Sequence, residues 1–557
     1  MSQRIIIDPI TRIEGHLRIE VELDEKNVVR DAWSSITLWR GIETIVKGRD
    51  PRDAPLMVQR FCGVCTYSHY EASILALEDA FGVRPPANAR IVRNLINAAQ
   101  YMTDHVMHFY HLHGLDWVDI TKALTADPKK AVDLAKSVHE NPYNCSETHY
   151  RAVQKRLTRY VESGRLGPFA NAYWGNPSFK LSPEANLVIV SHYLDALAVS
   201  KVGAQMMAIF GGKNPHPQSL VAGGITSVMD VLDAHRIGEY LFRFKEFKNF
   251  IETAYLPDVI IAAGAYKDEG LAGIGGGVKS YLCYGGFPLD DEWNKTLLPR
   301  GVVVAGDIAN PKELDENKIA EDVAHSWYKG DKPLHPYVGT TDPEYTGYDA
   351  KGNVKGDEKY TWGKSPTYEG QPYEVGPLAR FIVGYAQGHP QIKELVDGTL
   401  KATGLPVTVL FSTLGRTAAR ALETKLVADN AEGWINELVG NIKAGDTRTW
   451  TRCDVPKEGK GRGMTEVPRG ALGHWIVIKN HVIENYQAIV PSTWNCAPRN
   501  TEGKRGPYEE SLIGTRLANA EQPLEIIRTI HSFDPCMACA VHIISPRFRE
   551  IKKFRVL

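Results

Sequence analysis

Two pairs of cysteines are the residues of this chain best suited to chemistry. Cys62 and Cys65 form one Cys-x-x-Cys motif, and Cys536 and Cys539 form another close to the opposite end of the sequence. The two sulfurs of such a motif can reach one ion, and thiolates are soft ligands for zinc, nickel, copper(I) or iron. The pairs therefore predict a metal site or a set of reactive thiols.

The second pair lies in the stretch DPCMACAVH, which carries its own helix signal. Asp534 can cap a helix, and Pro535 suits the first turn of one. Cys536 and Cys539 would then both lie in that first turn, where the helix N-terminus favours the thiolate. This local chemistry favours metal binding or a reactive thiol.

Two simpler interpretations compete with a catalytic metal. A lone Cys-x-x-Cys can be a thiol–disulfide motif, although no thioredoxin-like βαβ pattern surrounds either pair. Two pairs together are typical of structural zinc, but such pairs usually lie about 12–20 residues apart. Here they lie near opposite ends of the chain, which favours a buried site at the centre of the fold. On spacing alone, structural zinc stays open.

The first pair stands in QRFCGVCTYSH, in which His69 follows Cys65 by one helical turn. From there its ring can donate a hydrogen bond to a cysteine sulfur and so tune a bound metal. The alternative is a histidine on a helix surface, which is the commoner fate of a lone histidine.

The composition is that of a globular chain long enough to bury a large core. Of its 557 residues, 65 are basic and 66 are acidic, a balance that gives no sign of a nucleic-acid or polybasic membrane surface. Its 8 cysteines are too few for a disulfide scaffold. We expect no membrane span, because apolar stretches such as residues 259–265 fall short of roughly 18 residues. The N-terminus shows no signal peptide.

Apolar periodicity predicts a mainly helical body. Alternating runs predict two hairpins, which turn at residues 24–27 and 479–480. Residues 326–377, rich in Tyr, Gly, Pro and Asp, predict a long surface excursion. Runs with a period near 3.6 residues predict helices over 88–112, 183–210, 233–256 and 414–443. We therefore expect an α+β fold, mainly α, as one domain over 1–557, with a large central bundle of long helices and small peripheral sheets.

Taken together, the motifs resemble those of the large subunit of nickel–iron hydrogenases, most closely the respiratory, uptake-type members. The resemblance covers essentially the whole chain, and the combination of RxCGxC with DPCxxCxxH at opposite ends is highly specific. The matching segments are RIEGHLRIEVE, WRGIE, RFCGVCTYSH, DHVMHFYHLHGLDWVDI, FSTLGRTAAR, PRGALGHW, VPSTWN and DPCMACAVH. The resemblance implies an enzyme that reversibly splits dihydrogen into protons and electrons.

The resemblance also implies which residues hold the metals. All four paired cysteines would bind nickel, with Cys62 and Cys536 as terminal ligands. Cys65 and Cys539 would also bridge to an iron that carries carbon monoxide and cyanide. A soft tetrathiolate site with an open position suits a redox metal that must bind a very small substrate.

A second, magnesium-like site is implied at Glu43, the backbone carbonyl of Cys496 and His542. Cys496 departs from the bulky apolar residue that is typical of this position in the family. Since the backbone atom would bind the ion, this departure barely weakens the assignment.

Dihydrogen splitting needs a hydride acceptor and a base side by side. The metals would accept the hydride, and the thiolate of Cys536 would take the proton. Glu14 in RIEGH is the candidate next carrier, because a carboxylate in a closed site can relay protons when burial raises its pKa. Without the resemblance, Glu14 would be interpreted as part of a Glu-Gly turn into the first strand.

Five further side chains are expected around the iron ligands. Arg469 would supply fixed donors to the anionic ligands, and Pro468 would shape an apolar wall. Asp104 and Asp534 would orient Arg469, and Ser492 would hydrogen-bond an iron ligand. The simpler alternatives are a surface turn for Arg469, a helix cap for Asp534 and a turn hydroxyl for Ser492.

A run of histidines in the DHVMHFYHLH segment looks like another metal site. We interpret it as packing or a partner-subunit surface, because such spacing on an apolar helix more often marks contact than ligation. These residues are His105, His108, His111 and His113.

The last residues, 543–557, resemble the extension that family precursors lose after nickel is inserted. While this tail is attached, the last segment could not place His542 inside, and the site would stay open for loading. We therefore expect cleavage between His542 and Ile543. The alternative is an ordinary terminal strand, since EIKKFRVL partly alternates.

Partners are implied because the chain has no further set of cysteines for several iron–sulfur clusters. Electrons would pass to an iron–sulfur small subunit, in a heterodimer or a dimer of heterodimers, and on to a cytochrome or quinone-linked acceptor. A maturation endopeptidase and nickel-insertion factors would assemble the site. The small subunit would carry an export signal and bring the complex to the periplasmic side of the membrane, whereas the chain alone looks cytoplasmic.

Three other classes of protein remain as alternatives. A related subunit of respiratory complex I would lack the paired cysteines, and all four are present here. A hydrogen-sensing regulator would share the motifs but lack the cleaved extension. A structural zinc protein would hold the same four sulfurs without a substrate position.

Overall fold

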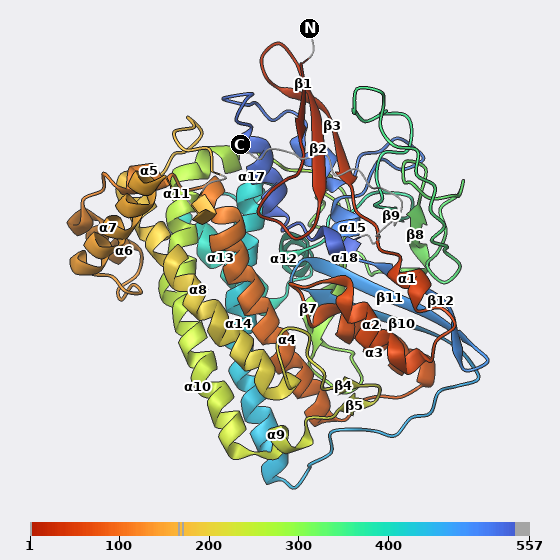
Figure 1. Cartoon of the computed structure of the whole chain (residues 1–557). Coiled ribbons are helices and arrows are strands. Elements are labelled where there is room, and N and C mark those ends of the chain that lie inside the picture. Colours follow the sequence, from red (N-terminus) through yellow and green to blue (C-terminus); the bar gives the residue numbers. More distant parts are fainter. Residues whose placement is uncertain (1–2, 165–166, 170–171, 541–557) are drawn as a thin grey trace.

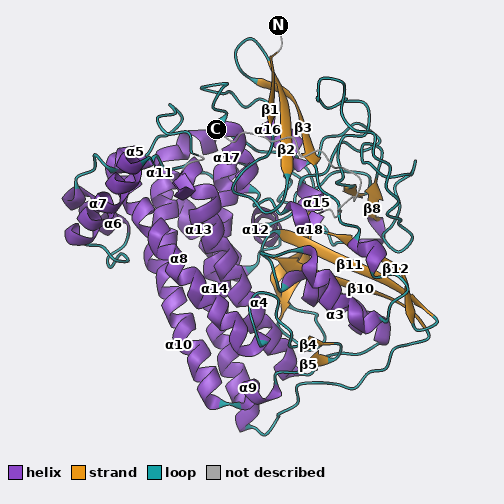
Figure 2. Ribbon diagram, in the orientation of Figure 1, coloured by secondary structure: helices purple, strands orange, loops and turns teal. Residues whose placement is uncertain are grey.

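The computed structural model describes most of the chain. It covers residues 3–164, 167–169 and 172–540, with the backbone alone at 168, 539 and 540. A bundle of long helices forms one side of the molecule, and small antiparallel sheets with long loops form the other (Figure 1). Figure 2 shows this division by secondary structure. The expected α+β, mainly α architecture is confirmed.

The long helices appear where the 3.6-residue period predicts them. Serine side chains cap the two longest, because Ser182 accepts from the Ala185 N–H and Ser412 from the Gly415 N–H. The helical run after residue 88 ends in a π-helix at His108–His113, and a second π turn, Ile251–Tyr255, joins two of the helices. The bundle consists of α4 (Ala87–Met107), α8 (Pro183–Gly211), α10 (Ala234–Phe250), α11 (Leu256–Leu271) and α14 (Thr413–Lys443).

By length and composition, α8 is long and apolar enough to cross a membrane. The expectation that no stretch reaches this length is therefore wrong for residues 183–211. The apolar window of α8 is nevertheless 61% buried inside the protein, and the helix packs against α4 and α10. This burial is the behaviour of a core helix in a large bundle.

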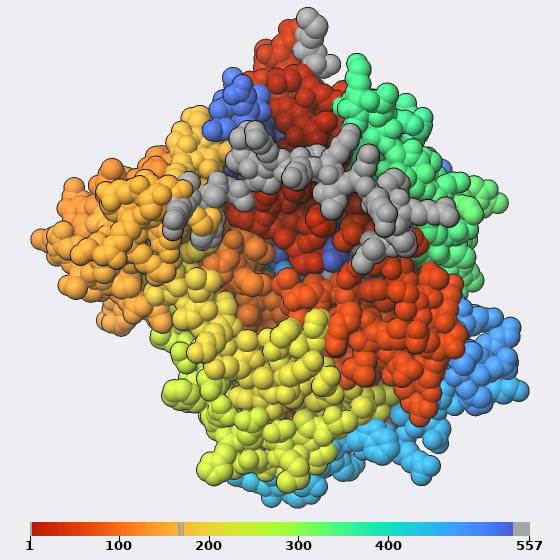
Figure 3. Space-filling view, in the orientation of Figure 1, coloured from red at the N-terminus to blue at the C-terminus, as the bar shows by residue number. Residues whose placement is uncertain are grey.

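Shorter helices surround the bundle and connect it to the sheets. In Figure 3 the orange-red surface of the α2–α3 region adjoins the yellow surface of the α8–α9 region. These helices are α1 (Ile42–Ile45), α2 (Ala54–Val58), α3 (Ser68–Phe81), α5 (Ile120–Ala123), α6 (Pro128–Val138), α7 (Glu147–Ser163), α9 (Val228–Leu232), α12 (Pro377–Ala386), α13 (Pro390–Thr403), α15 (Pro491–Asn495), α16 (Pro507–Leu512), α17 (Leu524–Ser532) and α18 (Met537–Ala540).

Two three-stranded antiparallel sheets contain the two predicted hairpins, and each has one strand that the sequence did not predict. The first sheet is ordered β1 (Gln3–Ile7), β2 (Leu17–Leu23), β3 (Val29–Ile36), and the second β10 (Glu458–Val467), β11 (Gly470–Lys479), β12 (Val482–Ile489). The unpredicted strands are β1 and β10. Three strand pairs complete the described sheets: β4 (Leu220–Val221) with β5 (Gly224–Ile225), β6 (Tyr281–Pro288) with β7 (Thr296–Val303), and β8 (Ile319–Asp322) with β9 (Ser365–Tyr368).

The contact between α3 and β10 sets the position of the first cysteine pair. A Cβ atom at Gly463 of β10 would lie 1.8 Å from the carbonyl oxygen of Ala72 on α3, so only glycine allows this approach. Because α3 begins three residues after Cys65, this close contact places the first cysteine pair beside the end of strand β10, at Val467.

The helix at the second cysteine pair begins later than predicted. It starts at Met537 rather than at Pro535, so Cys536 precedes the helix and does not lie in its first turn. Asp534 has a left-handed φ of 56°, and its carboxylate makes no capping hydrogen bond in the described chain. The prediction of an Asp534 cap is therefore wrong.

Candidate metal centre

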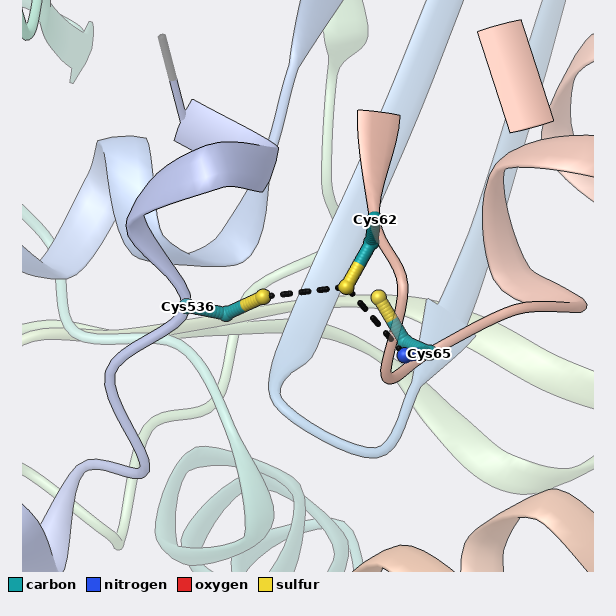
Figure 4. Close-up of side chains that lie close together, drawn as sticks. All are labelled: Cys62, Cys65 and Cys536. Atoms are coloured by element: carbon teal, nitrogen blue, oxygen red, sulfur yellow. Dashed lines mark hydrogen bonds between the residues drawn. The ribbon is translucent and has the colours of Figure 1, made fainter. Parts of the chain in front are cut away.

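Three cysteine sulfurs from the two ends of the chain meet in the interior. The Sγ atoms of Cys62, Cys65 and Cys536 all lie within 4.8 Å of one another, and all three residues are buried. The Sγ atoms of Cys62 and Cys536 are 3.3 Å apart, and Figure 4 shows the two segments approaching from opposite sides. The Cys62 sulfur also accepts the backbone N–H groups of Val64 and Cys65. The side chain of Cys539 lies outside the described part of the chain.

The N-terminal segment around Glu14 holds Cys536 in place. Glu14 and Cys536 form an isolated parallel bridge, in which Met537 N–H donates to the Glu14 carbonyl at 2.8 Å. Gly15, with a φ of 80°, is needed here because a Cβ would lie 2.6 Å from the nitrogen of Ala538. The two ends of the chain thus meet directly at the sulfur cluster.

The Glu14 side chain points at the cysteine that it supports. Its Oε2 lies 3.3 Å from the Cys536 sulfur and accepts the Ala538 N–H at 2.8 Å. Burial raises the pKa of Glu14, and the Cys62 thiolate raises it further, while the Ala538 N–H and Arg469 act against them. A carboxyl with a raised pKa can hold a proton nearer neutrality than an exposed glutamate.

An arginine between two aspartates lies beside the sulfurs. Arg469 Nη1 donates to Asp104 Oδ2 at 3.0 Å, and Nη2 lies 3.2 Å from Asp534 Oδ1. Burial raises the pKa of Asp104 to about 7, although the Arg469 charge opposes this shift. The three groups are buried, as their predicted roles require.

The remaining predicted residues of this site line the cavity between the sulfurs or adjoin it. Cys65, Cys536, His69, Arg469 and Ser492 all line a cavity of about 10 Å³, roughly the space for one small molecule. The Ser492 hydroxyl oxygen accepts the Cys536 N–H at 3.0 Å. Pro468 is buried directly before Arg469 and adjoins the cavity through its place in the chain.

The residues of the expected magnesium-like site have separate contacts. Glu43 accepts the Ala488 N–H at 2.9 Å and the Thr341 hydroxyl at 2.6 Å. The Cys496 carbonyl accepts the Ser34 hydroxyl at 3.4 Å. His542 lies outside the described residues, so the site as predicted is not brought together within them.

The histidine run does not gather into a cluster of ligands within the described residues. Three of its members instead bond to partners on other segments: His105 to Glu423 Oε1 at 2.9 Å, His108 to the His531 carbonyl at 2.7 Å, and His111 to the Tyr193 carbonyl at 3.1 Å. These bonds join α4 and the π-helix to α14, α17 and α8.

Sequence reasoning missed two arginines that hold the site together. Arg40 donates to the carbonyls of Phe61 and Ala538 and so ties both cysteine segments to one side chain. Arg380 donates at 3.0 Å to the carbonyls of Val467 and Pro468, directly before Arg469. Arg40 lies in the WRGIE segment, which could have signalled it, whereas Arg380 has no local signal.

The donor set fits a buried nickel–iron centre. Three converging sulfurs can each reach one ion at about 2.3 Å, and soft thiolates suit nickel and iron. Beside them, the Nε–H of Arg469 has no hydrogen-bond partner in the described chain. A buried donor of this kind usually faces an acceptor, which an anionic iron ligand would provide.

Comparisons with known proteins point the same way. Residues 40–542 match a family described as nickel-dependent hydrogenase, and residues 4–37 match one described as HoxL-like. The chain is 52% identical to the quinone-reactive Ni/Fe-hydrogenase large chain of Wolinella succinogenes, over 100% of this chain and 98% of the relative. It is 47% identical to the uptake hydrogenase large subunit of Rhizobium leguminosarum bv. viciae, over 100% of this chain and 98% of that one.

Solved structures agree. The oxidised Ni-Fe-Se hydrogenase from Desulfovibrio vulgaris Hildenborough has a TM-score of 0.79 and 36% identity, over 97% of this chain and 100% of that one. A second solved structure, the reduced, active Ni-Fe-Se hydrogenase from Desulfomicrobium baculatum, has a TM-score of 0.78 and 35% identity, over 97% of this chain and 100% of that one. The chain therefore belongs to the nickel-dependent hydrogenase family, as a large subunit of the uptake type.

Proposed function

We propose that this hydrogenase splits dihydrogen heterolytically, with Cys536 as the proton acceptor and Glu14 as the next proton carrier. The observation that carries this proposal is the 3.3 Å contact between the Cys536 sulfur and Glu14 Oε2 inside the buried sulfur cluster. A bound nickel–iron centre would supply the Lewis-acid and redox chemistry that polarises dihydrogen and takes up its electrons.

Cys62, Cys65, Cys536 and Cys539 would hold nickel, with Cys65 and Cys539 shared with iron. The Cys536 thiolate takes the proton at Sγ and passes it to Glu14 Oε2. Because burial raises the pKa of Glu14, the carboxyl can keep that proton until it moves on. The Ala538 N–H fixes the carboxyl in the direction of the sulfur.

Arg469 would bind the carbon monoxide and cyanide ligands of iron. Its Nε–H, which has no hydrogen-bond partner in the described chain, supports this role, and Asp104 and Asp534 hold the guanidinium at that position. Pro468 would exclude water on the same side, and the Ser492 hydroxyl would donate to an iron ligand while its oxygen accepts from Cys536 N–H. His69 would donate a hydrogen bond to a sulfur.

Glu43, the Cys496 carbonyl and His542 would bind magnesium or a similar ion. The mature chain would end at His542, after a maturation endopeptidase removes residues 543–557 and nickel-insertion factors load the site. Electrons would leave to an iron–sulfur small subunit, and the complex would act at the periplasmic side of the membrane. An intact mass that still includes the tail in active protein would contradict the cleavage.

Glu14→Gln tests the proton pathway. It keeps the size of the side chain but cannot carry a proton, so dihydrogen oxidation should fall by about 10²–10⁴-fold. Nickel per chain should stay at the wild-type level, because glutamine can still accept the Ala538 N–H. A wild-type rate in this variant would contradict the role of Glu14.

Metal analysis tests the centre itself. The chain, purified with its partner, should contain about one nickel per chain and no stoichiometric zinc. Zinc without nickel in a chain already cut at His542 would make the sulfur site structural. Full nickel in a protein that binds but does not turn over dihydrogen would favour a sensor.

A further inference from the structure

Glu14 lies on the connection between β1 and β2, which leaves the first sheet and reaches the sulfur cluster. This connection spans residues 8–16, and the Ile10 N–H closes its base by donating to the Leu17 carbonyl at 2.8 Å. Apart from the bridge at Glu14, residues 8–16 contain no helix or strand. The position of the Glu14 carboxyl therefore depends on the contacts that hold this connection.

One buried carboxylate binds both of the segments that bring Glu14 and Cys536 together. Asp116 is fully buried. Arg12 Nη2 donates to its Oδ1 at 2.5 Å, and His531 Nδ1 lies 2.6 Å from its Oδ2. Arg12 lies two residues before Glu14, and His531 lies five residues before Cys536.

His531 also binds the backbone of the connection directly. Its Nε2 lies 2.8 Å from the Thr11 carbonyl oxygen, and because a carbonyl can only accept, Nε2 donates this bond. A second proton lies between Nδ1 and the Asp116 oxygen, since two bare acceptors would repel each other at 2.6 Å. The segment before Cys536 and the segment before Glu14 are thus joined twice, once directly and once through Asp116.

The turn just before Glu14 needs this support. Arg12 has a left-handed φ of 56°, a conformation that residues with a Cβ atom rarely adopt. Its guanidinium donates to the Leu112 carbonyl at 2.6 Å as well as to Asp116. These bonds offset the backbone strain, so the direction in which the chain enters Glu14 depends on them.

The position of Asp116 is set by the helix that leads into Cys536. Helix α17 carries His531, which binds the Asp116 side chain, and Arg528, whose Nε donates to the Asp116 carbonyl at 2.9 Å. The carboxylate therefore takes its place from the Cys536 side of the site and passes it to the Glu14 side.

We propose that Asp116, His531 and Arg12 form a positioning clamp that sets the separation between Glu14 Oε2 and the Cys536 sulfur. The clamp rests on the proposed function, in which these two atoms exchange the proton. The described residues that line the cavity at the sulfurs include no member of the clamp, so the clamp acts on Glu14 and not on dihydrogen. A misplacement of about 1 Å can slow a reaction step by about 10²-fold, and the step that the clamp governs is proton transfer.

Isotope exchange separates this step from dihydrogen splitting, in enzyme purified with its partner. Conversion of parahydrogen to orthohydrogen measures splitting and recombination, whereas formation of HD from D₂ in ordinary water also needs the proton to leave the site. Asp116→Ala cuts the clamp and should lower the ratio of exchange to conversion by about 10-fold or more. Asp116→Asn should keep the ratio close to wild type, because its amide can accept from Arg12 and donate to His531 Nδ1.

Asp258→Ala is the matched control, because it breaks a similar arrangement elsewhere in the bundle. Asp258 is also buried, His192 Nδ1 lies 2.8 Å from its Oδ2, and His192 Nε2 lies 3.1 Å from the Tyr143 carbonyl. This variant should lose stability, as Asp116→Ala does, with an unchanged ratio of exchange to conversion. The ratio compares two rates of the same molecules, so it does not depend on the fraction of protein that holds nickel.

A wild-type ratio in Asp116→Ala would overturn the clamp. So would an equal drop in Asp258→Ala, which would mean a general loss of rigidity, or an equal drop in Asp116→Asn, which would mean that charge and not geometry acts. If Asp116→Ala binds no nickel, two variants of His531 decide. His531→Gln can still donate to the Thr11 carbonyl and His531→Leu cannot, so equal ratios in these two would overturn the proposal.

Glu14→Gln in the same assay distinguishes failure of the clamp from failure of the proposed function. Its exchange should be almost lost while parahydrogen conversion continues. If Glu14→Gln exchanges as fast as the wild type, the proposed function fails. If Glu14→Gln loses exchange and Asp116→Ala keeps the wild-type ratio, the clamp alone fails.

Discussion

The segment around Cys62 and Cys65 and the segment around Cys536 reach the same cavity with different support. The first is tied to α3, which packs closely against β10 over glycines. Among the described residues, the second is held by the bridge to Glu14, by the Glu14 side chain and by hydrogen bonds to Ser492 and Arg40. Both halves of the site, the segment around Cys62 and Cys65 and the segment around Cys536, are buried in the core. The first half is fixed by helix–sheet packing, whereas the second half is fixed by hydrogen bonds to segments distant in sequence. Under the proposed maturation, these hydrogen bonds would form last, after the metals are loaded.

The largest effect is expected where the first half depends on close packing. Gly463→Val would place a side chain 1.8 Å from the Ala72 carbonyl, and neither backbone can move far, so we expect a loss of about 4 kcal/mol or more in the free energy of unfolding. The thermal unfolding midpoint of the purified complex measures it. Gly433→Ala is the control, because a Cβ there meets nothing within 4 Å; equal midpoints for both variants would contradict the rigid first half.

A change in the second half should lower the nickel content of the protein more than its thermal stability. Gly15→Ala forces an alanine into a φ of 80° and toward the nitrogen of Ala538, at a cost of about 2–4 kcal/mol. We expect nickel per chain to drop sharply while the thermal midpoint of the protein changes little. Gly388→Ala shares the backbone strain, with a φ of 73° but no neighbour within 4 Å. If Gly15→Ala and Gly388→Ala bind equal amounts of nickel, the backbone bridge between Glu14 and Cys536 does not control closure of the metal site.

The sequence predicted the helical bundle better than the surroundings of the cysteine segments. The helical period located α4, α8, α10 and α14, because a long amphipathic or apolar pattern needs no partner to be recognised. The cysteine spacing likewise predicted that the two ends meet. In contrast, β10 carries three glycines and several charges, and its formation depends on pairing with β11 and packing against α3, which no local pattern shows.

The error at Cys536 has a physical cause. Asp534 and Pro535 form a good local helix start, but pairing with residue 14 outweighs that signal, and Asp534 adopts a left-handed conformation beside Arg469 instead. Arg380 was missed for a related reason. Its partners at the site, the carbonyls of Val467 and Pro468, lie far away in sequence, so no spacing marks it.

The buried carboxyl group of Glu71, in the first half, should affect the free energy of unfolding and not the amount of nickel that the chain binds. Glu71 on α3 accepts the Tyr67 hydroxyl at 3.1 Å, and burial raises its pKa from 4.5 to about 7 despite Arg93. The folded chain therefore binds this proton more tightly than the unfolded chain. Its contribution to stability is complete below 4.5 and is lost as the pH rises through about 7.

Glu71→Gln should remove that pH dependence. Between about pH 5 and pH 8, the unfolding free energy of the wild type should fall by on the order of 2–3 kcal/mol more than that of the variant. Thermal midpoints across this range measure the difference. Nickel per chain should be equal in both, and a loss of nickel in Glu71→Gln would mean that the two halves are not separable.

The smallest effect is expected at the hydroxyl that fixes Cys536. Ser492→Ala leaves the Cys536 N–H without its acceptor, which costs about 1–2 kcal/mol for a buried donor. Because the second half is fixed by hydrogen bonds and not by helix–sheet packing, the cost should appear as local opening. Hydrogen–deuterium exchange of the peptide around residues 533–540 should become faster while the rest of the chain is unchanged. Ser511→Ala is the control: it removes a buried hydroxyl bonded to the Tyr508 carbonyl and should leave exchange in that peptide unchanged. Faster exchange in both variants would mean that the segment responds to any loss of stability, and not to the hydrogen bond from Cys536 N–H to Ser492.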